Sequence, residues 1–397
     1  MQLADVEQAA RVAAELVRET PVVSSRTLSE RCGGTIALKA ENLQRTGSFK
    51  LRGAMAKIAS LGDACARGVV CGSAGNHAQA VAYAARSLGV PCEVFMPVGA
   101  PIAKLDAVAA LGAEVRLLGA AVDESLAAAR ERADEARMAF IHPFDDPVVI
   151  AGQGGIGLEL LRQVPDISRV VVPIGGGGLI SGIAVALKSQ LPEVEVIGVQ
   201  VQACASLPAS LAAGSAIAVE SALTIADGIA VKRPGELTLA LIRRLVNEVV
   251  LVGEDEVAEA MVFLLERAKL VVEGAGAVGV AALLSRRLGG REHGTTVIVL
   301  SGGNVGAGLL AEVARRHESQ AGRRLVLRAR ISDMPGSLAA LLMLLGSCGA
   351  NLLDVQHIRE GVDLHIRETA VQLVLETRGP EHAFEVTRAV RDAGYPD

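Results

Sequence analysis

Short runs of Val, Ile and Leu alternate with longer stretches of helical periodicity from about residue 65 onward. Apolar runs without polar interruptions are typical of parallel strands that are buried on both faces. The pattern predicts strands at 68–71, 92–96, 114–118, 139–142, 170–173, 196–199, 249–252 and 297–300, with helices that include 79–88, 102–111 and 125–137. Several of these strands end in a glycine-rich turn, which is where ligands bind in open α/β sheets. We therefore predict the α/β fold class.

The pattern changes after residue 317. The polar, glycine-containing stretch 318–324 is predicted to be a linker. A strand at 325–331, a helix at 337–348, strands at 353–358 and 370–376, and a helix at 381–393 follow it. This β-α-β-β-α series predicts a separate small α+β module. The expected organisation is a catalytic region at 1–317, the linker at 318–324 and the module at 325–397.

The composition is that of a soluble globular protein: of the 397 residues, 51% are hydrophobic and 21% are charged, and the formal net charge is −5. A nucleic-acid partner is not expected, because there is no basic stripe and two Tyr, six Phe and no Trp leave few rings for base stacking. Two long uncharged runs, 170–187 and 196–219, contain Pro and Gly and are too interrupted for membrane helices. We expect no membrane role.

The chain begins with an amphipathic, partly acidic helical pattern, so no export signal is expected. The six cysteines form no C-x-x-C pair and have no metal-finger spacing. They are interpreted as reduced and mostly buried thiols. The predicted compartment is the cytoplasm.

One lysine stands where a nucleophilic amine is favoured. Lys50 follows Thr46-Gly47-Ser48 in ENLQRTGSFKLRGA (41–54), at the predicted start of a helix. The positive end of a helix favours the neutral form of an amine, which is the form that Schiff-base chemistry requires. A surface lysine beside an N-cap remains an adequate interpretation of this segment alone.

Three turns after predicted strands provide partners for such a lysine. In CGSAGNHAQA (71–80), backbone N–H groups at a helix start make a nest for a carboxylate, and Asn76 can orient a ring hydroxyl. In VVPIGGGGLISG (171–182), four glycines leave room for a phosphate against the backbone amides. In VIVLSGGN (297–304), Ser301 can meet a ring nitrogen without protonating it. Each turn alone is compatible with a structural role, but the combination indicates pyridoxal phosphate and an amino acid.

These segments resemble the threonine/serine dehydratase family of fold-type II pyridoxal-phosphate enzymes, over residues 5–317. Further shared motifs are IAGQGGIGLE (150–159), TIADGIAVKRPG (224–235) and VVEGAGAVG (271–279). The resemblance implies the tryptophan synthase β-like fold, with two open twisted sheets and a smaller subdomain at roughly 40–145 inserted in the larger one. It also implies that the cofactor is pyridoxal 5'-phosphate.

By this resemblance, Lys50 is the catalytic residue and holds the cofactor covalently, with Phe49 against the ring and Asn76 at the ring hydroxyl. The phosphate is expected at Gly175, Gly176, Gly177, Gly178 and Leu179, and the pyridine nitrogen at Ser301. The substrate carboxylate is assigned to the loop formed by Ser73, Ala74, Gly75, Asn76 and His77. Asp227 and Glu273 also lie in shared motifs, although a loop cap and a helix N-terminal acid are adequate roles for them.

The reaction implied is the dehydration and deamination of L-threonine to 2-oxobutanoate and ammonia. L-serine dehydration to pyruvate and ammonia stays open, because one methyl group is worth only about 1–3 kcal/mol in a pocket. A serine racemase is disfavoured, because related racemases carry a second serine at the position of Ala74. A non-catalytic amino-acid sensor is disfavoured, since both the lysine and the glycine turn are present.

Two other positions differ from relatives of this family. The segment QVQACASL (200–207) lacks the acidic residues of the racemases' divalent-metal site, so no metal site is predicted, while a monovalent cation on backbone carbonyls stays open. Gly155 replaces the threonine of many relatives, and the sequence assigns no consequence to this change.

The module at 325–397 resembles an ACT domain, a ferredoxin-like amino-acid-sensing fold, through ISDMPGSLAALL (331–342). The resemblance implies allosteric control by an amino-acid effector, isoleucine or valine, at Asp333, Pro335, Gly336, Ser337 and Leu338. ACT domains usually bind effectors at shared interfaces, so a homo-oligomer, expected to be a tetramer, is also implied. Isoleucine biosynthesis is the implied setting, and a catabolic role stays open.

Overall fold

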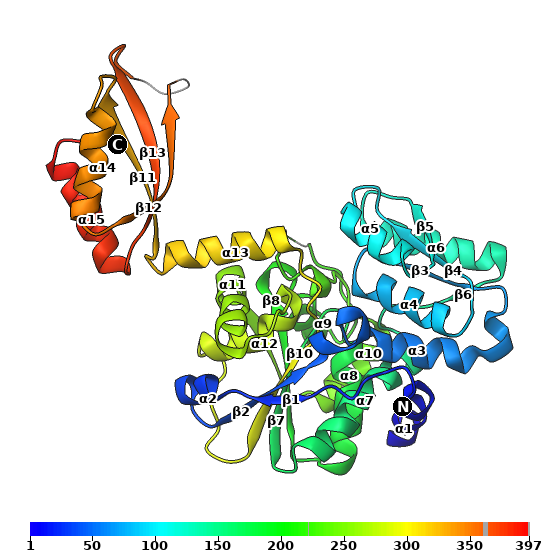
Figure 1. Cartoon of the computed structure of the whole chain (residues 1–397). Coiled ribbons are helices and arrows are strands. Elements are labelled where there is room, and N and C mark those ends of the chain that lie inside the picture. Colours follow the sequence, from blue (N-terminus) through cyan, green and yellow to red (C-terminus); the bar gives the residue numbers. More distant parts are fainter. Residues whose placement is uncertain (221, 360–363, 396–397) are drawn as a thin grey trace. The chain divides into compact units, whose positions relative to one another are not determined.

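The computed structural model describes residues 1–220, 222–359 and 364–395, and the chain divides into two compact units, Met1–Val305 and Gly306–Asp397. Most helices and strands of both units are labelled in Figure 1. The first unit contains two sheets and the second contains one.

The larger sheet of the first unit has six strands in the order β1-β2-β10-β7-β8-β9. The strands are β1 (Val22–Ser24), β2 (Thr35–Ala40), β7 (Ile167–Pro173), β8 (Glu195–Val201), β9 (Glu248–Val252) and β10 (Thr295–Leu300). All neighbours are parallel except β1 and β2, which pair antiparallel at the edge. Every residue of β10 is buried, as expected for a parallel strand covered on both faces.

The smaller sheet has four parallel strands in the order β5-β4-β3-β6 (Figure 1). Its strands are β3 (Val69–Gly72), β4 (Cys92–Met96), β5 (Glu114–Leu117) and β6 (Ala139–Phe140). The α/β fold class with two open sheets is thus confirmed. β1 and β2 were not predicted.

Helices pack around these sheets. Those of the first unit are α1 (Leu3–Ala13), α2 (Arg26–Cys32), α3 (Lys50–Leu61), α4 (Asn76–Ser87), α5 (Ile102–Ala109), α6 (Val122–Ala136), α7 (Pro147–Gln163), α8 (Gly178–Gln190), α9 (Ser206–Ala213), α10 (Glu236–Leu245), α11 (Glu254–Phe263) and α12 (Gly274–Leu284). The 3-10 turns η1 (Glu41–Leu43), η2 (Arg45–Gly47) and η5 (Asp227–Ile229) connect them near the sheet edges. The uncharged run 170–187 forms most of β7 and α8, and α8 is buried from Gly178 to Leu187. In the part of the chain that the structure describes, no helix is long and apolar enough to cross a membrane.

The second unit has an antiparallel sheet of order β11-β13-β12, formed by β11 (Arg324–Ser332), β12 (Asn351–Ile358) and β13 (Glu368–Glu376). Its core joins β11 and β13 to α14 (Ser337–Ser347) and α15 (Pro380–Asp392) through residues such as Leu327, Leu341, Leu373 and Val386. The predicted β-α-β-β-α order is therefore observed. Residues 318–324, expected to be a linker, comprise the end of α13 (Ala307–Gln320), a short turn and the first residue of β11, and the boundary between the units falls after Val305.

Candidate active site

The strand ends of the larger sheet bring several predicted site residues together. β2, β10 and β7 are adjacent and parallel, so the turns that follow them open at the same edge of the sheet. These turns lead to Lys50, Ser301 and the glycines at 175–178. The Phe49 N–H donates to the carbonyl oxygen of Ser301 over 3.1 Å and ties the lysine turn to the β10 turn. This edge is therefore the candidate active site.

Lys50 is the first residue of α3, and its side chain is partly buried. Nζ donates a 2.8 Å hydrogen bond to the carbonyl oxygen of Pro143 and lies 5.2 Å from the centre of the Phe49 ring. Desolvation lowers the pKa of Lys50 to about 8, while the Glu273 carboxyl acts in the opposite direction. A larger fraction of this amine is neutral at pH 7 than of a surface lysine, which suits a nucleophile and base.

The four glycines form a narrow turn before α8. Gly177 has a φ of 95°, which favours glycine, and it precedes the first turn of α8, whose free N–H groups attract an anion. A Cβ on Gly176 would lie 2.3 Å from the Phe144 ring, and one on Gly175 would lie 3.1 Å from the Cα of Ile229. The turn is held between two other segments. Packing therefore requires glycine at these positions, in addition to the phosphate site that the sequence predicts.

The loop after β3 is the predicted site for the substrate carboxylate, and it ends where α4 begins at Asn76. The Gly75 N–H donates to Ser73 Oγ over 3.2 Å, and residues 73–76 are partly exposed. The first N–H groups of α4 have no partner within the helix. N–H groups at a helix start attract anions, so the loop is compatible with the carboxylate site that the sequence predicts.

Two predicted site residues direct their side chains away from a ligand. Leu179 packs in the core beneath the larger sheet. His77 is 4% exposed, and its Nε2 lies 3.0 Å from the carbonyl oxygen of Ile141. Burial lowers the pKa of His77 to about 3, so its ring stays neutral near pH 7. Both residues can offer the site their backbone N–H groups only.

Asn76 is held by a chain of hydrogen bonds that the sequence did not predict. Its Nδ2 donates to Oε1 of Glu273 over 2.7 Å, and its Oδ1 accepts from Nδ2 of Asn304 over 2.7 Å. The same Asn304 nitrogen donates to the carbonyl oxygen of Thr46 over 2.8 Å. Glu273 directly precedes α12, yet its side chain makes no capping hydrogen bond to that helix. Its carboxyl is directed at the candidate site instead.

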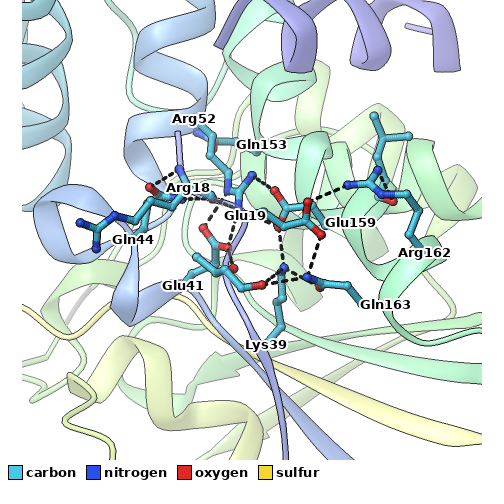
Figure 2. Close-up of polar contacts among 12 residues, drawn as sticks. Arg18, Glu19, Lys39, Glu41, Gln44, Arg52, Gln153, Glu159, Arg162 and Gln163 are labelled. Carbon is cyan, nitrogen blue, oxygen red and sulfur yellow. Dashed lines mark hydrogen bonds and ion pairs between the residues drawn. The ribbon is translucent and has the colours of Figure 1, made fainter. Parts of the chain in front are cut away.

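A buried cluster of charged side chains includes Arg52, which lies two residues after Lys50 in the first turn of α3 (Figure 2). The Arg52 guanidinium donates to both oxygens of Glu41 at 2.8 Å and to those of Glu159 at 2.6 and 3.0 Å. Lys39 of β2 donates to Glu159 over 2.5 Å and to the carbonyl oxygen of Thr20 over 2.7 Å. None of these four charged side chains is more than 10% exposed. Two positive and two negative groups thus join β2, η1, α3 and α7.

The residues predicted for an effector lie in the second unit, around the turn between β11 and α14. Gly336 has a φ of 91° and is the N-cap residue of α14, and Ser337 and Leu338 begin that helix after Pro335. Asp333 accepts two hydrogen bonds from Arg359, of 2.7 and 3.0 Å, and this guanidinium lowers the pKa of Asp333. The turn is formed as the sequence suggests, and its effector role stays a prediction.

The residues at the sheet edge fit pyridoxal phosphate. The largely desolvated amine of Lys50 suits an aldehyde, and the N-terminus of α8 with its glycine turn suits a phosphate. The site thus has an attachment point for the cofactor and a cradle for its phosphate.

Comparisons with known proteins agree with this fit. The profile of the family described as "Pyridoxal-phosphate dependent enzyme" matches residues 13–302. An L-threonine ammonia-lyase of Thermotoga maritima is 47% identical over 395 residues, covering 99% of this chain and 98% of the relative. One from Geobacter sulfurreducens is 49% identical, covering 96% and 94%. The catabolic L-threonine dehydratase of Escherichia coli is 46% identical, and the match covers 78% of this chain and 94% of the relative.

Solved structures give the same result for the fold. The processed form of threonine deaminase isoform 2 from Solanum lycopersicum superposes with a TM-score of 0.74 at 36% identity, covering 79% of this chain and 86% of that protein. The maize serine racemase superposes with a TM-score of 0.75 at 35% identity, covering 80% and 98%. The likeness to both proteins leaves the choice between elimination and racemisation to the residues of the site.

Proposed function

Given that the chain belongs to the family of pyridoxal-phosphate dependent enzymes, we propose that it deaminates L-threonine to 2-oxobutanoate and ammonia. The observation that carries the proposal is the position of Lys50, whose desolvated amine stands at the sheet edge beside the glycine turn. Full-length relatives named L-threonine ammonia-lyase support the choice of substrate.

The cofactor, when bound, supplies an aldehyde that joins the substrate amine and a ring that stabilises negative charge at the α-carbon. Lys50 would hold it, the N–H groups at residues 175–179 would bind its phosphate, and Ser301 would face its ring nitrogen. A hydroxyl at that position leaves the nitrogen unprotonated, which favours rapid elimination over a long-lived carbanion.

The chain's own groups then perform the proton transfers and the positioning. The Lys50 amine, when free, removes the α-proton at Nζ, because desolvation keeps much of it neutral near its pKa of about 8. The start of α4 binds the substrate carboxylate through backbone N–H groups. Phe49 and Phe144 contribute apolar surface beside the lysine and the glycine turn. This surface limits the access of water during the reaction.

Elimination is favoured over racemisation by one residue. Racemisation requires a group that returns a proton to the face opposite Lys50. Ala74 has no such group. The His77 ring is hydrogen-bonded to the Ile141 carbonyl oxygen, and its pKa is about 3. L-serine remains a second candidate substrate, since it differs from threonine by one methyl group.

The test measures turnover and cofactor binding together. The purified enzyme should show the visible absorbance of a lysine-bound cofactor and form 2-oxobutanoate from L-threonine, with kcat/KM for L-threonine above that for L-serine. Lys50→Ala should lose both the absorbance and the turnover. Lys57→Ala is a matched control, since Lys57 lies on the same helix but pairs with Asp146. A fully active Lys50→Ala variant would refute the assignment, and a higher kcat/KM for L-serine would make the enzyme a serine dehydratase.

We also propose that the second unit is an ACT-type regulatory module and that the cytoplasmic enzyme works as a homotetramer. The relative from Escherichia coli is named a threonine dehydratase, although the match covers only 78% of this chain. This supports a separate function for the part of the chain that is not matched. The effector would be isoleucine or valine at the turn around Gly336. Equilibrium binding of each amino acid to the full chain tests this, and binding that survives Gly336→Trp would contradict it.

A further inference from the structure

Glu273 lies where three parts of the candidate site meet. It is 7% exposed, its N–H donates to the carbonyl oxygen of Gly302 over 3.1 Å, and its Oε1 accepts from Asn76 over 2.7 Å. A Cβ on Gly302 would come within 2.4 Å of that oxygen and 3.1 Å of Asn76 Nδ2. In the turn after β10, the absence of a side chain at Gly302 therefore leaves room for the Glu273 carboxyl and the Asn76 amide.

The partners in the chain fix the direction of both amides. The carbonyl oxygen of Thr46 can only accept, so it faces the NH₂ group of Asn304. The other N–H of that group faces Oδ1 of Asn76, which turns the Asn76 NH₂ group toward Glu273. One N–H of this NH₂ group remains for a ligand. The charge of Glu273 thus acts directly on the nitrogen that would meet the cofactor ring hydroxyl.

Charged groups from three further elements face Glu273. Burial raises the pKa of Glu273 to about 7, the hydrogen bond from Asn76 lowers it, Asp227 of η5 raises it, and Lys104 of α5 and Lys50 of α3 lower it. Lys104 and Asp227 pair with each other over 2.9 Å and are 33% and 64% exposed. The smaller subdomain and the larger one thus contribute opposite charges near the same carboxyl. Both surface groups can be changed without opening the core.

We propose that Glu273 is a positioning residue of the reaction, and that the charge on its carboxyl sets, through Asn76, how the cofactor ring hydroxyl is held. The inference rests on the proposed function. An ionised carboxylate is the stronger acceptor and draws the Asn76 N–H toward itself, whereas a protonated carboxyl group accepts the same N–H more weakly. The hydrogen bonding at the ring therefore changes when Glu273 gains or loses its proton.

The first measurement does not depend on turnover. Infrared spectra of the full chain, with and without cofactor, are recorded between pH 5 and pH 9 for the wild type and for Glu273→Gln. We expect a band of a protonated carboxylic acid that disappears around pH 7 in the wild type and is missing from Glu273→Gln. The variant keeps the size of the side chain and an oxygen for Asn76, so it removes the charge with little change in shape.

The second measurement is the pH dependence of kcat/KM for L-threonine. The wild type should show an inflection near pH 7 that is absent in Glu273→Gln. Lys104→Ala should move the inflection to higher pH, because a positive charge that favours the carboxylate is lost. Asp227→Asn should move it to lower pH, because a negative charge that opposes the carboxylate is lost. Exposed charges give shifts of about 0.2–0.7 of a pH unit.

The two measurements separate failure of this inference from failure of the proposed function. If the wild type does not turn over L-threonine, the proposed function fails, whatever the infrared band shows. If turnover is present but Glu273→Gln retains the inflection of the wild type, Glu273 is structural only and the inference is wrong. Shifts of Lys104→Ala and Asp227→Asn in the same direction would also overturn it.

Discussion

Arg52 gives the sharpest prediction about how the chain positions its lysine. It is 3% exposed, stands two residues after Lys50, and its guanidinium holds two buried carboxylates. Replacing it by Met keeps an unbranched apolar side chain in place of the aliphatic part of Arg52 and removes the charge. Glu159 then keeps Lys39 as an ion-pair partner, whereas Glu41, which is fully buried, keeps the hydrogen bond from the Thr20 hydroxyl and the more remote charge of Lys39. The perturbation therefore leaves one buried carboxylate without its ion-pair partner.

The expected loss follows from that carboxylate. Removing one partner of a buried ion pair costs about 3–5 kcal/mol of unfolding free energy. In the wild type, burial acts to raise the pKa of Glu41, but Arg52 outweighs it and holds this pKa below its ordinary value. This stabilisation is therefore present above the ordinary pKa of glutamate, about 4.3, and is lost as the pH falls through the lower folded-state value. In Arg52→Met, both lowering effects of Arg52 on the pKa of Glu41 are lost, and burial is opposed only by the hydrogen bond from Thr20 and the charge of Lys39. The pKa of Glu41 therefore rises, and the variant loses stability as the pH rises instead. The difference between the two proteins should be largest near pH 7 and should shrink toward pH 4.

Urea unfolding followed by far-ultraviolet circular dichroism, at several pH values, measures this difference. The double variant Arg52→Met/Glu41→Gln should recover part of the loss at pH 7, because the uncompensated charge is gone. A loss below about 1 kcal/mol, or a loss of equal size at pH 4 and pH 7, would refute the account of this cluster.

Three other changes have clear expected outcomes. Gly155→Ala in α7 should stabilise the protein by about 0.5–1 kcal/mol, because a Cβ at this position meets only Ala10 and Arg52, both at 3.7 Å. Gly182→Ala should destabilise the protein, because its Cβ would lie 2.2 Å from the Ile150 carbonyl oxygen. Urea unfolding of both variants measures this contrast. Gly177→Ala should weaken cofactor binding, measured by equilibrium dialysis, because an alanine is strained at the φ of 95° and its Cβ would lie 2.8 Å from the Ile242 side chain. An unchanged affinity for the cofactor would argue against the phosphate site. Removal of residues 306–397 should preserve L-threonine turnover and abolish any effector response; a truncated enzyme that still responds would place the effector site in the first unit.

The sequence predicted the buried parallel strands well, because uninterrupted Val and Ile runs such as 297–300 have few alternatives to a strand. It did not predict β2, where Lys39 stands next to apolar residues and suggests an exposed segment. The charged partner that allows Lys39 to be buried, Glu159, lies 120 residues away along the chain. Local patterns carry no information about such a pairing.

The candidate site shows the same division. The sequence could predict Lys50 and the glycine turn as site residues because their chemistry is concentrated within a few consecutive residues. The hydrogen-bond chain through Asn304 and Glu273 was not found, because its members come from four separate segments that only the fold brings together. His77 lies within a predicted site motif, yet the structure uses its ring as a partner for Ile141. A motif identifies which loop faces a ligand, and the fold decides which side chains do.

The central claim is that Lys50 carries the cofactor, and chemical trapping tests it most directly. Borohydride reduction of the cofactor-loaded enzyme makes the bond between lysine and cofactor permanent, and mass spectrometry of the digested protein then locates it. The account predicts a single modified peptide that contains Lys50, and no modification of Lys39 or Lys57, whose amines are held by Glu159 and Asp146. Modification of another lysine in place of Lys50, or a loaded enzyme with no modified lysine, would contradict it.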